Sequence, residues 1–479
     1  MTARGGAGLR PDPTGDGPVS EGPGARWVSD DNAPLLTDLY ELTMAASYHA
    51  RGMNGEATFD LFVRELPPTR RFLVACGLED ALRFLERLRF DDEAIAYLRT
   101  LGLFADDFLA FLGRLRFTGE VRAVPEGEIV FRGEPILSVT APLIEAQIVE
   151  TFLLNCITYQ TMVASKAARV ALACGDKSFV DFSPRRDHGA DAALKAARAA
   201  YVGGATGTSN VLAGMIYGLP LSGTMAHSYV MAFEDETAAF RSFCRDFPDN
   251  AVLVVDTFDV EEGTRRAARV ATELAARGGA LRGVRIDSGD LAPLTRSVRK
   301  ILDEAGLNAV AIVLSGDLDE YRIKDLMDAG VPADRFGVGT HLGTSADAPS
   351  LGSVYKLVAE GGEPKIKLST GKATLPGRKQ LFRFFDGGRF ARDVISLEEE
   401  EAADGAVPLL ECVMARGGRR MGASPSLVDI KSRCRARLEQ LPEGLRSLEA
   451  GGEPYEVRTS PRLSALVDAM QRRDGGSVE

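Results

Sequence analysis

The sequence predicts an α/β fold in which a parallel sheet, closed into a barrel, is joined to a region of antiparallel strands. Between about residues 144 and 355 one unit recurs: a short apolar run, a polar loop and then a helical stretch, as in AVLVVDTFD and GVRIDSGD. Repeated units of this kind are typical of parallel strands with helical crossovers. On both sides of this region, short alternating runs between Gly and Pro turns are typical of antiparallel strands.

Composition fits a folded protein of two or three domains, since the chain has 479 residues, 45% of them hydrophobic and 26% charged. Lys and Arg number 57 against 68 Asp and Glu, which gives a net charge of −11. A general binder of nucleic-acid backbones needs a basic stripe, so this balance argues against one. A small anionic substrate needs only a few local cations, and the charge balance leaves that open.

Cysteine usage and hydropathy bear on the compartment. The six cysteines stand singly, and no Cys/His spacing suits zinc. The first 26 residues have no apolar centre, so they do not read as a secretory signal. The most apolar helical stretch, residues 142–174, is interrupted by Glu145, Glu150 and Lys166, which does not suit a membrane span. We therefore expect a cytoplasmic protein with neither membrane nor nucleic-acid partners.

In order along the chain, residues 1–30 are rich in Gly and Pro and predict a disordered tail. Residues 31–143 predict an α+β domain: a helix after Thr37-Asp38, a strand over 58–67, a pair of helices within 79–115 and antiparallel strands over 117–143. A long helix over 144–173 opens the barrel domain, 144–355. The C-terminal segment, 356–479, returns to strands and ends in helices, and its acidic run Glu398–Glu401 is expected in solvent.

Polar loops follow the apolar runs, and in a parallel array such loops gather at the carboxyl ends of the strands. VRIDSGDL places Arg285 and Asp287 at one strand end. Two charges beside buried neighbours need partners, which a ligand or a salt bridge between the two residues would each supply. Asp290 stands where it would cap the next helix.

Glycine follows two consecutive strands, in VLSGDLDE (Gly316) and FGVGTHLG (Gly339). Glycine there lets backbone N–H groups approach an anion at a helix start. Each turn taken alone is equally a tight connection, but barrel phosphate sites are commonly built from the last two strands.

The loop FVDFSPRRDHG carries Arg185, Arg186 and His188. Arginine forks match carboxylate and phosphate geometry. An ion pair with Asp187 or Asp191 at the surface is the alternative for at least one of them.

The four histidines differ in setting, and a lone histidine is more often structural than catalytic. His49 lies on a predicted helix. His227, in SGTMAHSYV, follows a short apolar run and has small neighbours that allow close approach. His188 and His341 lie in candidate site loops. No nucleophile set and no metal-ligand cluster stands out.

Taken together, LLTDLYELTM, DFSPRRDHG, SGTMAHSYV, VRIDSGDL and GVGTHLGTS with SVYKLV resemble the nicotinate phosphoribosyltransferase family, in its order and spacing from about residue 33 to 370. The resemblance implies an irregular parallel α/β barrel of the type II phosphoribosyltransferase kind. It also implies a second α+β domain formed from the N- and C-terminal segments, and a homodimer with shared active sites.

The resemblance also implies roles for particular residues. Tyr40 would stack on the nicotinate ring, reaching into the neighbouring subunit's site, and Thr224 and Arg285 would contact nicotinate. Asp287 would lie near the ribose hydroxyls and Arg185 near the phosphates. His227 matches the histidine that the family phosphorylates from ATP. The phosphoribosyl group would be held by Gly316, Asp317, Gly339 and Thr340.

The implied reaction is the ATP-coupled transfer of phosphoribosyl from phosphoribosyl pyrophosphate to nicotinate, giving nicotinate mononucleotide and pyrophosphate in NAD biosynthesis. The pyridine nitrogen already has a free lone pair, so no general base is required. Catalysis would come from orientation and from stabilising the leaving group, with Mg²⁺ bridging phosphate oxygens rather than held by a protein cluster. Phosphorylating His227 would add about two negative charges to the pocket.

Two alternatives remain at this stage. Nicotinamide phosphoribosyltransferases carry an acidic residue around GATGTSNVLAG, where this chain has Ser209 and Asn210, which favours the acid substrate. A non-catalytic nucleotide-binding barrel is the other alternative, because fold alone does not establish activity. A decayed site usually loses at least one of its residues, whereas this chain keeps all four: Tyr40, His227, Arg285 and Thr340. We have no physical account of His341 beside Thr340.

Overall fold

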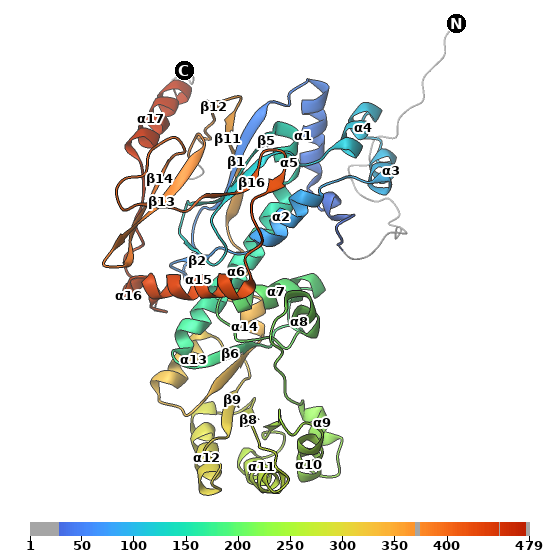
Figure 1. Ribbon diagram of the computed structural model, residues 1–479, viewed down its shortest axis with the longest axis vertical. Helices are drawn as coiled ribbons and strands as arrows, with labels where there is room; N and C mark the ends of the chain where they lie inside the picture. Colours follow the sequence, from blue (N-terminus) through green and yellow to red (C-terminus); the bar gives the residue numbers. More distant parts are fainter. Residues whose placement is uncertain (1–27, 369–373, 450, 476–479) are drawn as a thin grey trace.

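The computed structural model describes residues 28–368, 374–449 and 451–475, so the tail predicted over 1–30 lies almost wholly outside the described residues. The described chain forms two parts (Figure 1). The part drawn at the top holds mainly antiparallel sheets, and the part drawn below holds a parallel sheet. The long helix α6 (Glu150–Cys174) passes from one part to the other.

The largest sheet combines strands from both ends of the chain. Its order is β12-β11-β1-β5-β3-β16-β17. β1 pairs antiparallel with β11 from the C-terminal half, and β3 pairs antiparallel with β16. The prediction of a second domain formed from N- and C-terminal segments is therefore confirmed. Its strands are β1 (Glu56–Val63), β3 (Glu120–Ala123), β5 (Pro135–Pro142), β11 (Ser353–Glu360), β12 (Glu363–Pro364), β16 (Glu411–Ala415) and β17 (Arg419–Arg420).

A four-stranded sheet of order β15-β13-β14-β18 and a two-stranded sheet β2-β4 complete this part. Their strands are β2 (Leu73–Val74), β4 (Ile129–Val130), β13 (Lys379–Asp386), β14 (Arg389–Leu397), β15 (Val407–Pro408) and β18 (Val457–Thr459). The helices around these sheets are η1 (Ala33–Leu35), α1 (Leu39–Ala50), α2 (Leu78–Arg87), α3 (Asp92–Thr100), α4 (Asp106–Arg114), α5 (Leu143–Ile148), α15 (Leu427–Gln440), α16 (Glu443–Arg446) and α17 (Pro461–Gly475).

Helix boundaries differ from the sequence expectation in two places. The pair of helices expected within 79–115 is three helices, because Asp91 caps α3 by accepting a hydrogen bond from Ala94 N at 2.8 Å. Gly102 then follows the end of α3 with a φ of 63°, a conformation that favours glycine. The single helix expected over 144–173 is two, α5 and α6, which meet at Val149.

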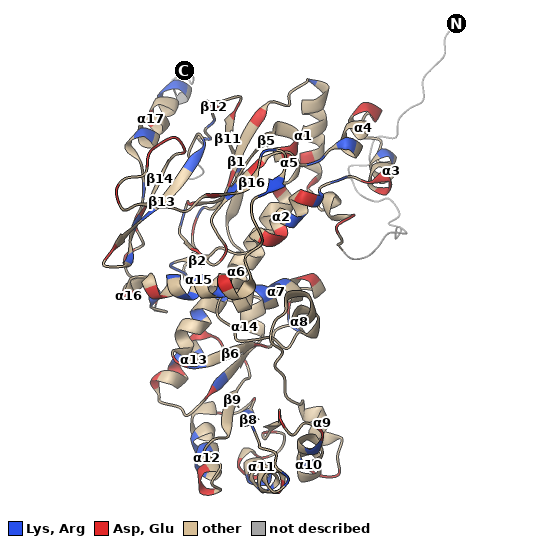
Figure 2. Cartoon of the chain, viewed as in Figure 1, with Lys and Arg blue, Asp and Glu red and all other residues tan. Residues whose placement is uncertain are grey.

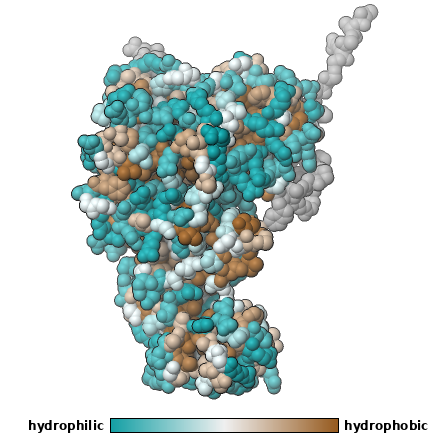
Figure 3. All heavy atoms as spheres, in the orientation of Figure 1, coloured by the Kyte–Doolittle hydropathy of each residue, from teal (hydrophilic) through white to brown (hydrophobic). Residues whose placement is uncertain are grey.

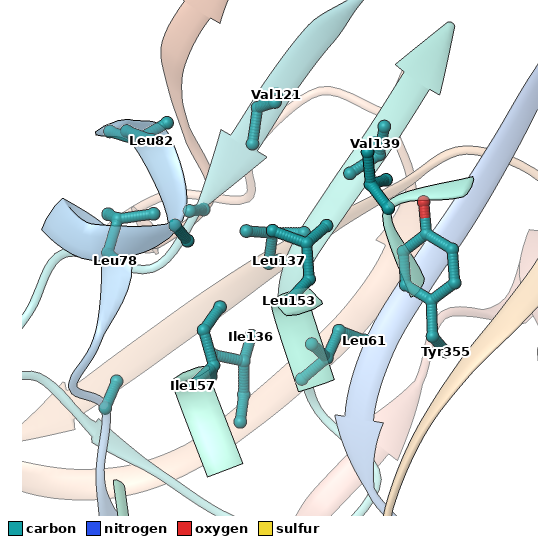
Figure 4. Packing of buried hydrophobic residues seen from close by; sticks show 14 of the residues in the cluster. Leu61, Leu78, Leu82, Val121, Ile136, Leu137, Val139, Leu153, Ile157 and Tyr355 are labelled. Carbon is teal, nitrogen blue, oxygen red and sulfur yellow. The ribbon is translucent and has the colours of Figure 1, made fainter. Parts of the chain in front are cut away.

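The core of this part lies between the large sheet and α6. Leu61 on β1 and Leu137 on β5 are buried against Leu153 and Ile157 of α6 (Figure 4). Tyr355 on β11 is also buried, and its hydroxyl donates to Ala146 O at 2.9 Å. The apolar residues of β1 and β5 thus fix α6, which carries the chain into the parallel sheet.

The parallel sheet has the order β6-β10-β9-β8-β7. Beyond β6 it continues through two single parallel bridges, Asp181 to Thr208 and Thr208 to Leu221. Seven segments thus follow one another around a ring in chain order, because β10 returns to pair with β6. No pairing within the described residues joins Leu221 to β7, so the barrel has one gap there. The irregular barrel is confirmed, and its strands are β6 (Ser178–Asp181), β7 (Val252–Val254), β8 (Gly283–Ile286), β9 (Ala311–Leu314) and β10 (Arg335–Val338).

Helices connect the barrel strands: α7 (Ala190–Val202), α8 (Val211–Tyr217), α9 (His227–Met231), α10 (Glu236–Asp246), α11 (Val260–Ala275), α12 (Leu291–Glu304), α13 (Glu320–Asp328) and α14 (Thr340–Gly343). Asp259 and Asp319 cap α11 and α13 through their side chains. Asp290 occupies the same position on α12 but makes no capping hydrogen bond, so that expectation was wrong. Acidic and basic residues are mixed along outer helices such as α12 (Figure 2).

The acidic run Glu398–Glu401 is only partly in solvent. Glu398 Oε2 accepts from Arg378 Nε at 2.6 Å, and Glu400 Oε1 accepts from Ser460 Oγ at 2.6 Å. The expectation of a wholly solvated run was wrong because this turn packs between β14 and the start of α17. Among the described helices, none is both long and apolar enough to cross a membrane.

Candidate active site

Arg285 joins three strand ends of the barrel. It lies on β8, and its Nη2 donates to Asp287 Oδ1 at 2.7 Å. Its Nε donates to Ser315 Oγ, just past β9, at 2.8 Å, and its Nη1 to Thr224 Oγ1, just past Leu221, at 3.1 Å. The salt bridge between Arg285 and Asp287 that the sequence left open is therefore present. It also holds the guanidinium in one orientation.

Asp287 is held as a carboxylate. Burial alone would raise its pKa, but the hydrogen bond from Ser315 Oγ at 2.5 Å and the charge of Arg285 outweigh burial and lower the pKa. Its backbone N–H donates to Asp256 Oδ2 at 2.9 Å, and Ser288 Oγ donates to the same oxygen at 2.6 Å. Asp256, at the end of β7, therefore fixes the turn that follows β8.

His227 begins α9, at the gap in the barrel. Its Nδ1 lies 3.1 Å from Thr257 Oγ1. Its Nε2 lies 3.8 Å from Asp287 Oδ2 and 3.9 Å from Asp256 Oδ1. Asp256 Oδ1 is buried and has no hydrogen-bond partner among the described residues. The imidazole thus stands between a hydroxyl on one side and two carboxylates on the other.

Gly316 and Asp317 make the turn after β9 with left-handed backbones, at φ values of 93° and 48°. A Cβ on Gly316 would lie 1.9 Å from the carbonyl oxygen of Asp287. Only glycine allows this approach, so the turns after β8 and β9 are in direct contact.

The turn after β10 packs on the loop after β6. Gly339 precedes α14, which begins at Thr340, and a Cβ on Gly339 would lie 3.1 Å from Phe182 O. The ring of Phe182 in turn lies 5.6 Å from the Arg285 guanidinium carbon. Gly343, at the end of α14, leaves no room for a Cβ beside Asp187. Burial, together with the charge of Asp181, raises the pKa of Asp187 to about 6.

Arg185 and Arg186 are exposed on the loop after β6. Neither makes an ion pair with a described residue, because Asp187 accepts from Ser183 Oγ at 3.0 Å and Asp191 pairs with Lys195 at 2.7 Å. The surface ion pair considered for one of these arginines was therefore wrong. Both guanidinium groups stay available at the rim.

Tyr40 is not part of this group of residues. It lies on α1 in the upper part of the molecule, 45% exposed and near Glu150, whereas Arg285 lies in the lower part (Figure 1). In the 204–214 loop, Asn210 Oδ1 caps α8 through Ala213 N at 3.1 Å. His341 is half-buried on α14, and the structure gives no further account of it.

The group of residues around Arg285, Asp287 and His227 at the carboxyl ends of the barrel strands is called the barrel mouth below. Three of its residues were not singled out from the sequence: Ser315, Asp256 and Thr257. In AVLVVDTFD, as in the other barrel strands, polar residues directly follow an apolar run, and this pattern could have identified Asp256 and Thr257. Ser315 was missed because the segment VLSGDLDE was interpreted only through Gly316, as a glycine turn that could bind an anion.

Comparison with known proteins decides the family. A model of the nicotinate phosphoribosyltransferase N-terminal domain matches residues 35–158, and the model of the nicotinate phosphoribosyltransferase family matches residues 177–369. A nicotinate phosphoribosyltransferase of Mycobacterium tuberculosis is 47% identical over 440 residues, which cover 92% of this chain and 94% of that protein. The chain belongs to the nicotinate phosphoribosyltransferase family.

Other members of the nicotinate phosphoribosyltransferase family are also similar. The nicotinate phosphoribosyltransferase of Bacillus subtilis is 43% identical over 385 residues, covering 78% of each chain. The crystal structure of human nicotinic acid phosphoribosyltransferase superposes with a TM-score of 0.82 at 31% identity, covering 91% of this chain and 99% of that one. The resemblance inferred from the motifs is therefore confirmed over most of the chain.

Proposed function

We propose that this chain transfers phosphoribosyl from phosphoribosyl pyrophosphate to nicotinate and releases pyrophosphate, a step of NAD biosynthesis. One observation carries the proposal: Arg285 is locked by Asp287, Ser315 and Thr224 at the barrel mouth, beside two glycine-led turns. This arrangement offers a fixed guanidinium for a carboxylate and backbone amides for phosphates.

The site residues fit the steps of this reaction. The bond from the anomeric carbon to the pyrophosphate oxygen breaks, and a bond to the pyridine nitrogen forms. Arg285 and Thr224 would orient the nicotinate carboxylate, and Asp287 would bind ribose hydroxyls. The leaving group and the 5′-phosphate would be bound by Arg185, Gly316, Asp317, Gly339 and Thr340. Orientation and charge stabilisation then supply the rate acceleration.

The acid is the proposed substrate rather than the amide. Arg285 attracts a carboxylate, and in the 204–214 loop the chain has Ser209 and Asn210 where an aspartate would accept from an amide. Asn210 is already occupied, since its Oδ1 caps α8 and its Nδ2 donates to Ala193 O at 3.2 Å.

ATP and Mg²⁺ are the proposed co-substrate and cofactor. ATP would transfer its γ-phosphoryl group to His227 and release ADP, and the added charge would reorganise the mouth. Mg²⁺ prefers carboxylate and phosphate oxygens. The described residues hold no cluster of three or more metal-ligating side chains. We therefore propose that Mg²⁺ binds together with the diphosphate and supplies charge neutralisation there.

A homodimer with shared sites is the proposed assembly. The residues Val211, Leu212, Met215, Ile216 and Leu221 form an exposed apolar group on and beyond α8, which we call the α8 patch. In Figure 3, which has the orientation of Figure 1, the surface at the place of α8 is coloured as hydrophobic. Apolar patches of this kind mark interfaces, and Leu39 and Tyr40 on α1 are likewise exposed. A second copy covering the α8 patch would bring its own Tyr40 to the mouth.

All six cysteines are free thiols, which supports a cytoplasmic location.

The test is product identification. Purified protein is incubated with phosphoribosyl pyrophosphate, Mg²⁺ and either nicotinate or nicotinamide, with and without ATP, and the products are separated by mass. We expect nicotinate mononucleotide and pyrophosphate, formed faster with ATP. Nicotinamide mononucleotide as the main product would support the amide alternative, and no product from either ring would support the non-catalytic barrel.

A further inference from the structure

A cavity of about 720 Å³ lies between the large sheet and the four-stranded sheet. Its walls come from four parts of the chain: β1 with the following loop 64–71, the segment 131–135, β13 and β14, and the segment 451–459. No residue of the barrel mouth lines it. The volume falls in the range of sites for small molecules, which is roughly 300–1,000 Å³.

The cavity carries an excess of basic groups: six of its lining residues are basic and three are acidic. The Arg64 guanidinium has no partner among the described residues, and its Nε is buried. Arg71 donates only to backbone carbonyls, to Gly444 O at 2.6 Å and Glu449 O at 3.3 Å. Arg132 is paired with Glu65, and the third acid, Glu453, is exposed. Two arginines therefore remain without a carboxylate.

Asp60 adds a buried acceptor to the same cavity. It is 1% exposed, and its Oδ2 lies 2.8 Å from Lys379 Nζ, which is also buried. Its Oδ1 is buried without a hydrogen-bond partner. Buried polar atoms are nearly always paired, so an unpaired carboxylate oxygen beside a cavity indicates a donor that a ligand supplies.

Aromatic rings form the apolar part of the wall. Phe131 is 3% exposed, because it stacks on Tyr455 with ring centroids 3.8 Å apart and has the Arg383 guanidinium over its ring. Tyr455 and Phe62, which also line the cavity, are the rings on which a flat aromatic ligand would stack.

We infer that this cavity is a second ligand site, for a mononucleotide: an aromatic base that carries a phosphate. The base would lie against Tyr455 and Phe62 and donate to Asp60 Oδ1, and the phosphate would bind Arg64 and Arg71. A free inorganic anion would use only the arginines, and an uncharged nucleoside only the rings and Asp60.

The cavity is connected to the barrel mouth through Arg70, which lines it. Arg70 Nη2 donates to Asp347 Oδ1 at 3.0 Å and also to Ser345 Oγ. Ser345 has a left-handed backbone, with φ at 47°, two residues after the end of α14 (Thr340–Gly343). A ligand that displaces the loop 64–71 therefore acts on the segment that follows α14, the helix whose first residue is proposed to hold phosphoribosyl. Coupling between two such sites is reciprocal.

Binding of AMP to the full-length protein tests the inference without an assay of phosphoribosyl transfer, so its failure is separate from failure of the proposed function. By calorimetry we expect AMP to bind at least about 10-fold more tightly than adenosine or inorganic phosphate, since each lacks one half of the recognition. Arg64→Ala should weaken AMP binding by about 10-fold or more. The matched control Arg116→Ala, on the surface outside the cavity, should leave it unchanged.

Two measurements on the unaltered protein remain decisive if Arg64→Ala does not fold. An azido-AMP photolabel should map to peptides containing residues 62–71 or 451–459. Amide exchange within residues 340–348 should change when AMP binds. Labelling confined to the barrel turns, or affinity equal for AMP and phosphate, would overturn the site. Correct labelling with unchanged exchange at residues 340–348 would overturn the connection through Arg70.

Discussion

Arg285 and Asp287 leave the same strand two residues apart, and Arg285 Nη2 meets Asp287 Oδ1 at 2.7 Å. Here Ser315 Oγ bonds both partners, to Arg285 Nε at 2.8 Å and Asp287 Oδ1 at 2.5 Å. Arg285 Nη1 therefore faces Thr224, and Asp287 Oδ2 faces His227. The pair is thus a preorganised cation and anion at the rim, oriented before a substrate binds.

Replacing Gly316 tests the contact between the turns after β8 and β9. In Gly316→Ala the new Cβ would lie 1.9 Å from Asp287 O, so the turn must move. A displacement of this size should lower kcat/KM by about 100-fold. Gly306→Ala is the matched control, because Gly306 also has a positive φ, 73°, but open space around it. Full activity in Gly316→Ala would show that the two turns need not touch.

His227 and Asp256 test the proposed ATP coupling. His227→Ala should abolish stimulation by ATP and label transfer from γ-³²P-ATP while retaining slow ATP-independent transfer. Asp256→Asn should lower labelling of His227 by about 10-fold. A side-chain amide has only one oxygen, so it cannot both accept the two hydrogen bonds from the turn after β8 and place a carboxylate oxygen beside the imidazole. His49→Ala, which alters a ring packed on Phe111, is the control. Undiminished stimulation by ATP in His227→Ala would refute this role.

Mixed dimers test the shared site. Tyr40→Ala and Arg285→Gln should each be inactive alone. If Tyr40 serves the neighbouring subunit, co-expressed chains carrying one change each form dimers with one intact site. About a quarter of the unaltered activity should then return. In the control, a chain that carries both changes is co-expressed with the unaltered chain. Its mixed dimers keep no intact site, so its activity, also about a quarter, comes from unaltered homodimers alone, whereas it would be about half if Tyr40 served its own subunit. No recovery from the first pair, with dimers present by light scattering, would place Tyr40 outside the shared site.

Glu41 on α1 should make stability depend on pH. Burial raises its pKa to about 7, against opposing hydrogen bonds from Thr151 and Thr37. A carboxyl whose folded-state pKa is raised stabilises most below its unfolded pKa, and this stabilisation is lost as the pH rises through about 7. Between pH 5.5 and 8 the loss should be about 2 kcal/mol. Urea unfolding should show a smaller pH dependence for Glu41→Gln than for the unaltered chain or Glu439→Gln, a surface control. An equal dependence in all three would exclude Glu41.

The sequence was informative about the rim of the barrel because strand polarity alone sends every βα loop to one edge. Arg285, Gly316 and Gly339 were identifiable on that basis. The resemblance added Thr224, whose segment contributes only a single bridge at Leu221 and carries little strand signal.

What the sequence did not reveal depends on contacts between distant segments. The second hydrogen bond of Ser315 and the unpaired oxygen of Asp256 arise only when β7, β8 and β9 lie side by side. The partial burial of Glu398 likewise requires Arg378, which immediately precedes β13, the strand paired with β14. The cavity beside Asp60 joins four segments far apart in the chain, so no local pattern indicated it.

The most direct test of the account is the ratio of kcat/KM for nicotinate to that for nicotinamide, measured for the unaltered chain and for Arg285→Gln. Loss of the Asp287 contact affects both substrates alike, so the ratio isolates the carboxylate contact. Arg296→Gln, on the exposed side of α12, is the control. We predict that Arg285→Gln lowers the ratio by about 100-fold, the value of two charge-assisted hydrogen bonds. A ratio that stays unchanged would contradict the claim that Arg285 holds the nicotinate carboxylate at the barrel mouth.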